Sequence, residues 1–155
     1  MISTLIDSPV GPLTARARDG WLVGLAFGAQ GGAEDDGALP EVRRQLREYF
    51  SGERRTFTLE LDLAGTDWER RVWSELVSIP YGETRSYGQI AARACERTGV
   101  RAARAVGAAN AANPVVIIVP CHRVIGADGR LVGFGGGLET KRRLLDLEAG
   151  RLALV

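Results

Sequence analysis

The residues most able to do chemistry gather at one point of the chain. The run Pro120-Cys121-His122-Arg123-Val124 places the only histidine of the 155 residues directly after one of the two cysteines. The thiolate is the nucleophilic form of cysteine, and a nearby histidine and arginine can lower a cysteine pKa well below its free value of about 8.5. The run therefore predicts a reactive thiol at Cys121, and a half-buried cysteine with no chemical role is the alternative.

The spacing does not favour a direct dyad between the thiol and the imidazole. The apolar stretch Val115 to Val119 precedes the run and predicts a strand, and adjacent residues of an extended segment point in opposite directions. A bridging water or a sharp turn must then connect Cys121 with His122. Because no second histidine is available as a distant base, a papain-like hydrolase is disfavoured.

Length and composition exclude several classes of protein. The chain suits one domain or two small ones, and it has neither a basic-then-apolar leader nor an apolar run near the roughly 18 residues of a membrane helix. We therefore expect a cytoplasmic protein with no membrane partner. A reducing compartment favours free thiols at Cys95 and Cys121. One histidine and no Cys-x-x-Cys motif argue against a metal site, and we expect no metal and no cofactor.

Charge is distributed unevenly around a net value of +1. Residues 1–65 hold seven arginines against ten acids, whereas residues 66–155 hold thirteen basic residues against nine acids. From Arg97 to Ala127 there are four arginines and no acid. This asymmetry favours docking of a polyanion on the second half. The alternative is a solvated face in a chain that uses nineteen arginines and a single lysine.

The first part of the chain predicts strands and one helix. Apolar runs between Ser3 and Phe27 are interrupted by the hairpin signal Asp19-Gly20. A helix is expected to begin at Pro40 and to be stopped by Gly52, and the alternation from Phe57 to Leu63 predicts a half-buried strand.

From Thr66 onward the pattern is mainly helical. The capping boxes Thr66-x-x-Glu69 and Ser86-x-x-Gln89 predict two helix starts, and we expect Trp68 and Trp73 of the first helix in the core. A last helix is expected from Leu138 to Glu148.

A helix-turn-helix is expected in this second part. After the turn at Thr98-Gly99, a third, alanine-rich helix should cover Arg101 to Ala112. Arg101 and Arg104 lie three residues apart on one face, and small neighbours would let this helix enter a DNA groove. A well-packed alanine helix with incidental arginines is the alternative.

Together these motifs resemble the O6-alkylguanine-DNA alkyltransferases, in particular the bacterial methylated-DNA-protein-cysteine methyltransferases. The cysteine run, Asn113-Pro114 before it and Gly135-Gly136-Gly137 after it carry the resemblance, which extends from about Gly65 to Gly150 and more loosely through Asp7 to Leu13. It implies an α/β N-terminal domain over residues 1–64, ribonuclease-H-like, with an antiparallel sheet and a helix. Residues 65–155 would form a mostly α, helix-turn-helix (winged-helix-like) domain that carries the active cysteine.

The resemblance also implies a reaction. Cys121 would attack the alkyl carbon on guanine O6 and keep the alkyl group as a thioether, so that one protein repairs one lesion. His122 would act through a water as the base, with Glu148 orienting the imidazole and Asn113 bracing the turn. Tyr87 would help to rotate the nucleotide out of the helix and donate to the base.

Further residues are expected at the DNA. Arg104 matches the arginine that fills the gap left by the flipped base. A main-chain amide near the guanine O6 would stabilise charge on the leaving group. The remaining residues expected at the DNA or the base are Arg101, Asn110, Ala111, Arg123, Val124, Phe134 and Gly135.

The chain departs from the family pattern at three places. The segment between Tyr87 and Arg104 is a few residues longer, Phe134 stands where tyrosine is common, and Gly135 stands where serine or alanine is frequent. The expected partner is double-stranded DNA containing O6-alkylguanine, with O4-alkylthymine as a further substrate to test. We expect a monomer, with cooperation between protomers on DNA as an open alternative.

Three other functions fit the sequence less well. A non-repairing sensor of the alkyltransferase-like type replaces the cysteine, often with tryptophan, so Cys121 argues against it. A transcription regulator of the adaptive-response type would need a longer chain and further cysteines. A hydrolase using Cys121 would turn over repeatedly.

Overall fold

The computed structural model describes residues 1–31, 37–95 and 99–151. It divides into two compact units. The first comprises residues 1–64, 114–116 and 146–155, and the second comprises residues 65–113 and 117–145. None of the helices in these described ranges is long and apolar enough to cross a membrane.

A three-stranded antiparallel sheet forms the first unit. Strands β1 (Ile2–Ile6), β2 (Leu13–Arg18) and β3 (Trp21–Phe27) pair in chain order. Asp19 and Gly20 join β2 to β3 with φ angles of 52° and 85°, as a tight turn with two left-handed residues requires. The predicted hairpin is therefore confirmed.

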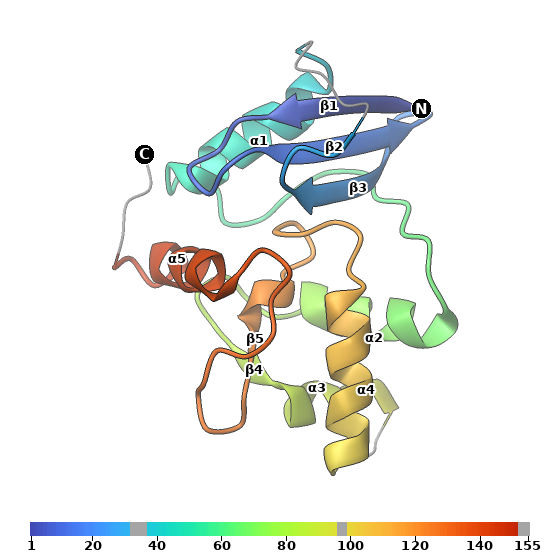
Figure 1. The fold of residues 1–155 in the computed structure, drawn as a ribbon, viewed down its shortest axis with the longest axis vertical. Coiled ribbons are helices and arrows are strands. Elements are labelled where there is room, and N and C mark those ends of the chain that lie inside the picture. Colours follow the sequence, from blue (N-terminus) through green and yellow to red (C-terminus); the bar gives the residue numbers. More distant parts are fainter. Residues whose placement is uncertain (32–36, 96–98, 152–155) are drawn as a thin grey trace. The chain divides into compact units, whose positions relative to one another are not determined.

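Helix α1 (Pro40–Phe50) lies across one face of this sheet (Figure 1). It begins at the predicted proline, and its buried side chains are Val42, Gln45, Leu46, Tyr49 and Phe50. Arg43 donates from Nη2 to the Leu5 carbonyl of β1 at 2.8 Å, so the helix is also fixed to the sheet by a polar contact.

The prediction of two further strands is wrong, because neither segment forms more than a single bridge. Of the segment from Phe57 to Leu63, only Leu61 forms a bridge, with Leu22 of β3. Of Val115 to Val119, only Val115 does so, with Leu25. Each segment makes two backbone hydrogen bonds along the edge of β3 and then departs, so the apolar pattern reflects burial rather than strand pairing.

The second unit is built mainly from helices. These are α2 (Asp67–Val77), α3 (Tyr87–Cys95), α4 (Val100–Ala111) and α5 (Leu138–Glu148), whose last three residues belong to the first unit. Both predicted capping boxes form, since Thr66 and Glu69 exchange two hydrogen bonds and so do Ser86 and Gln89. Thr98 of the predicted turn, and the centre of the longer segment at residues 96–98, lie outside the described residues.

Two tryptophans of α2 fix the position of α4. Trp73 is 1% exposed and donates from Nε1 to the Ala109 carbonyl at 2.8 Å. Trp68 donates to the Ala105 carbonyl at 3.1 Å, but it is only half-buried, so the prediction of two core tryptophans holds for Trp73 alone.

A short parallel pair links the helices to the cysteine run. Strand β4 (Arg85–Ser86) pairs with β5 (Val124–Ile125), a contact too short for any sequence periodicity to indicate. It places the start of α3, and thus Tyr87, beside the residues that follow Cys121.

Gly65→Ala tests the packing of Trp73. A Cβ at Gly65 would lie 2.4 Å from Cη2 of Trp73, so the buried indole has to shift. We expect the free energy of unfolding, measured in urea, to fall by about 1–3 kcal/mol. The control is Gly31→Ala, because a Cβ at Gly31 meets nothing within 4 Å. Equal stability of the two variants would contradict this packing.

Candidate active site

Cys121 lies on a sharp turn and not at the end of a strand. Cys121–Arg123 forms a single 3₁₀ turn, with the Cys121 amide donating to the Val119 carbonyl at 2.8 Å and the Arg123 amide to the Pro120 carbonyl at 3.0 Å. Successive side chains on such a turn diverge by about 120° and not by the 180° of a strand. The expectation of an extended segment at His122 is therefore wrong, and the sharp turn that was expected as one way to connect Cys121 with His122 is present.

The thiol and the imidazole are both removed from water. The Cys121 residue is 4% exposed and His122 is fully buried. A reagent or a substrate atom must therefore come into a closed environment to reach the thiol.

Two asparagines hold this turn, Asn110 in the last turn of α4 and Asn113 just after the helix. Asn113 donates from Nδ2 to the Val119 carbonyl at 2.7 Å, as expected for the residue that braces the turn. Asn110 donates to the Cys121 carbonyl at 3.3 Å and is 5% exposed. In this structure Asn110 therefore supports the cysteine turn, and its expected place at the DNA or the base stays a prediction.

The chain enters the turn through a strained residue. Ile117 is 1% exposed and has a φ of 72°, a left-handed conformation that β-branched residues rarely adopt. Such a conformation costs on the order of 1–3 kcal/mol and persists only where the surroundings impose it. The hydrogen bond from Asn113 to Val119, two residues further on, closes this bend.

Arg123 also supports the turn. Its guanidinium donates from Nη1 to the Ile79 carbonyl at 2.7 Å and lies 5.8 Å from the centre of the Tyr81 ring. The residue is 6% exposed. These contacts hold its charge inside the protein, and the expected place of Arg123 at the DNA or the base stays a prediction.

Lys141 of α5 is a site residue that sequence reasoning missed. It is fully buried, and its Nζ donates to the carbonyls of Val124 at 2.6 Å and Val132 at 3.1 Å. The Tyr87 hydroxyl donates to the same Val132 carbonyl at 3.3 Å. The signal in the sequence was that this is the only lysine beside nineteen arginines.

These contacts join the cysteine turn to the glycine-rich segment. Val124 directly follows the turn and is fully buried, and the half-buried Phe134 ring lies 5.8 Å from Lys141 Nζ. Gly135 is exposed, and a Cβ there would meet nothing within 4 Å. Gly135 therefore borders open space.

Burial dominates the ionisation of the thiol. Removal from water raises the pKa of Cys121 above its ordinary value, although the Asn113 amide, the Lys141 charge and the amides of Cys121 and His122 oppose this. The expected lowering of the Cys121 pKa is therefore wrong for this structure. Burial, and then the Cys121 charge, also raise the pKa of Tyr87. At neutral pH the thiol form prevails, and a proton acceptor is needed.

One face of α4 carries the predicted arginines. Arg101 and Arg104 are exposed, and the exposed neighbours Ala105, Ala108 and Ala111 are small. This face is smooth and positively charged, as the DNA-binding interpretation requires.

Glu148 lies at the end of α5, among the residues of the first unit. It is 6% exposed and its Oε2 accepts a hydrogen bond of 2.7 Å from the Tyr49 hydroxyl. The Tyr49 contact was not expected from the sequence. The partnership of Glu148 with His122 stays a prediction.

Lys141→Met tests the electrostatics of the thiol. The Lys141 charge lowers the pKa of Cys121, so its removal should raise that pKa and shift the pH curve of Cys121 alkylation by iodoacetamide upward by about one unit. Peptide mass spectrometry follows Cys121, with Cys95 as the internal reference. Arg142→Met removes an exposed charge from the same helix and should leave the curve in place. Superimposable curves for Lys141→Met and the unmodified protein would refute the interaction.

Comparisons with known proteins agree with this geometry. Residues 67–150 match the DNA binding domain of 6-O-methylguanine DNA methyltransferase, and residues 1–63 match the ribonuclease-like domain of the same family. The methylated-DNA--protein-cysteine methyltransferase of Mycobacterium bovis is 51% identical over 154 residues, which cover 94% of this chain and 91% of the relative. That of Methanosarcina barkeri is 43% identical over 161 residues, covering 98% and 99%.

A solved structure shows the same fold. The crystal structure of Mycobacterium tuberculosis OGT in complex with DNA matches with a TM-score of 0.90 at 51% identity, covering 97% of this chain and 94% of that one. The predicted architecture, an α/β part followed by a mostly helical part, is confirmed. This chain belongs to the 6-O-methylguanine DNA methyltransferase family.

Proposed function

We propose that this protein repairs O6-alkylguanine in double-stranded DNA by moving the alkyl group to Cys121. The observation that carries the proposal is a buried thiol on a braced turn, in a chain matching the family's DNA binding domain. The bond from the alkyl carbon to guanine O6 breaks and a bond to the Cys121 sulfur forms. The thiol proton leaves, and the guanine recovers its ordinary protonated form.

The raised pKa of Cys121 means that the reaction needs a base. We infer that His122 accepts the thiol proton through a water and that Glu148 stabilises the resulting imidazolium. This assignment follows from the family resemblance, and the burial of all three residues supports it.

The leaving guanine is stabilised by groups around the glycine-rich segment. Tyr87 and a main-chain amide at Phe134 or Gly135 are proposed to donate to the flipped base. Val124 would form a wall of the pocket. Because Phe134 offers no hydroxyl and Gly135 leaves open space, larger alkyl groups than methyl are candidates for acceptance.

The exposed face of α4 is proposed to enter the DNA. Ala111 and its small neighbours would let the helix approach the DNA closely. Arg101 would contact a phosphate, and Arg104 would enter the base stack at the position that the flipped base has left. We propose residues 65–155 as the domain that binds DNA and carries the chemistry, and residues 1–64 as a separate N-terminal domain.

A non-repairing sensor of alkylated DNA is the second candidate. That class lacks the cysteine, whereas Cys121 is present here and braced. We therefore favour repair. A thioether has no good leaving group, so each protein is consumed by one reaction, and we propose that a monomer is sufficient.

The site of transfer can be tested by mass. After incubation with duplex DNA containing O6-methylguanine, the peptide that carries Cys121 should gain the mass of one CH2 unit. Cys121→Ala should abolish the gain, and Cys95→Ala should retain it, because the Cys95 thiol donates to the Ala91 carbonyl within its own helix. If the DNA is repaired while the Cys121 peptide stays unmodified, the proposal is contradicted.

Salt dependence tests the DNA-binding face. If Arg101 neutralises one phosphate, Arg101→Ala should weaken duplex binding and reduce the slope of log K against log salt concentration by about 1. Arg18→Ala makes the same change at the exposed end of β2 and should leave the slope unchanged. Equal slopes for Arg101→Ala and the unmodified protein would remove Arg101 from the interface.

A further inference from the structure

A buried hydrogen bond connects two residues that lie 99 positions apart. The Tyr49 hydroxyl of α1 donates to Glu148 Oε2 at 2.7 Å, and the two residues are 0% and 6% exposed. We infer that Tyr49 is a positioning residue for alkyl transfer, which holds the Glu148 carboxylate in its working orientation. The inference rests on the proposed function of Glu148 and extends it to a fully buried side chain of α1.

The chemistry of a buried carboxylate makes such a donor valuable. A carboxylate removed from water is costly unless its oxygens accept hydrogen bonds, and the bond to a hydroxyl favours the ionised form. A donor on Oε2 also fixes the rotation of the group and leaves Oε1 the capacity to accept from a second donor. A partner that must stabilise an imidazolium needs both properties.

The ring of Tyr49 is itself held in place by two aromatic neighbours. Phe50 packs edge-on, with ring centroids 5.2 Å apart and planes at 75°. Phe57 lies 5.5 Å away with planes at 38°. A fully buried ring between two such contacts has one available direction for its hydroxyl, and that direction meets Glu148.

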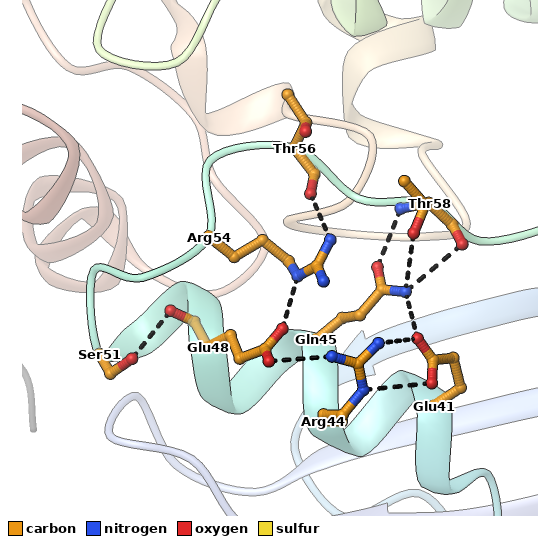
Figure 2. A network of polar contacts seen from close by, with 8 residues as sticks. All are labelled: Glu41, Arg44, Gln45, Glu48, Ser51, Arg54, Thr56 and Thr58. Carbon is orange, nitrogen blue, oxygen red and sulfur yellow. Dashed lines mark hydrogen bonds and ion pairs between the residues drawn. The ribbon is translucent and has the colours of Figure 1, made fainter.

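A network of polar contacts joins α1 to the segment from Arg54 to Thr58 (Figure 2). Gln45 accepts from the Thr58 amide at 2.9 Å and donates to the Thr58 hydroxyl at 3.1 Å. Arg54 donates to Glu48 at 2.8 Å and to the Thr56 carbonyl at 3.0 Å. These bonds attach to α1 the residues on both sides of Phe57.

Tyr49→Phe isolates the hydroxyl, because it removes one oxygen and keeps the ring. We expect the first-order rate of methyl transfer at saturating methylated duplex to fall about tenfold, the effect of one hydrogen bond to a charged group. Duplex affinity should stay unchanged. Ser51→Ala removes an exposed hydroxyl that donates to the Glu48 carbonyl at the end of the same helix, and it should leave the rate unchanged.

Urea unfolding checks that both variants are folded under the assay conditions. A merely structural role would lower the stability of Tyr49→Phe without changing the transfer rate of the folded protein. A Tyr49→Phe protein that is folded and transfers at the unmodified rate overturns the inference.

A double-mutant cycle separates this inference from the function proposed for Glu148. Glu148→Gln should slow transfer, and adding Tyr49→Phe to it should change the rate less than about twofold, because the two residues act as one unit. Independent, multiplying losses would overturn the positioning role while leaving Glu148 in the mechanism. A Glu148→Gln protein with unmodified rate would overturn both.

Discussion

Burial of the Cys121 thiol is the constraint on which the rest of the site depends. A thiolate is the form that reacts, yet removal from water favours the thiol and raises its pKa. The structure offsets part of this cost with the Asn113 amide, the buried Lys141 ammonium and backbone N–H groups. The offset is incomplete, so the free protein keeps its nucleophile protonated. A protonated thiol is oxidised less readily than a thiolate, and it becomes nucleophilic when a base takes its proton.

The helix α4 connects this thiol to the exposed basic face. Its first turns present Arg101 and Arg104 to the outside, and its end supplies Asn110 and holds Asn113 against the cysteine turn. Trp73 holds the helix in place through its hydrogen bond to the Ala109 carbonyl. A single rigid element therefore carries both the residues proposed to displace a base and those that support the nucleophile. The distance between the base-displacing residues and the nucleophile is therefore set by one helix.

Local signals in the sequence predicted much of the fold, because capping boxes, the Asp19-Gly20 turn and helical spacing act over few residues. The bounds of α5 were predicted from Leu138 to Glu148. Strand pairing and burial were not predictable in this way. The apolar run after Pro114 indicates burial, and the burial of Asn110 and Arg123 could not be inferred from their residue types. The contacts of Lys141 and Tyr49 reach across 17 and 99 residues, where no periodicity helps.

The central claim is that one buried thiol is consumed in one reaction. A known amount of protein is mixed with a large excess of duplex containing O6-methylguanine, and the restored guanines are counted over time. The account predicts a rapid rise to a plateau of one repaired guanine per protein, with no further repair when fresh duplex is added. A count that continues to rise in proportion to time would show turnover and would contradict the account.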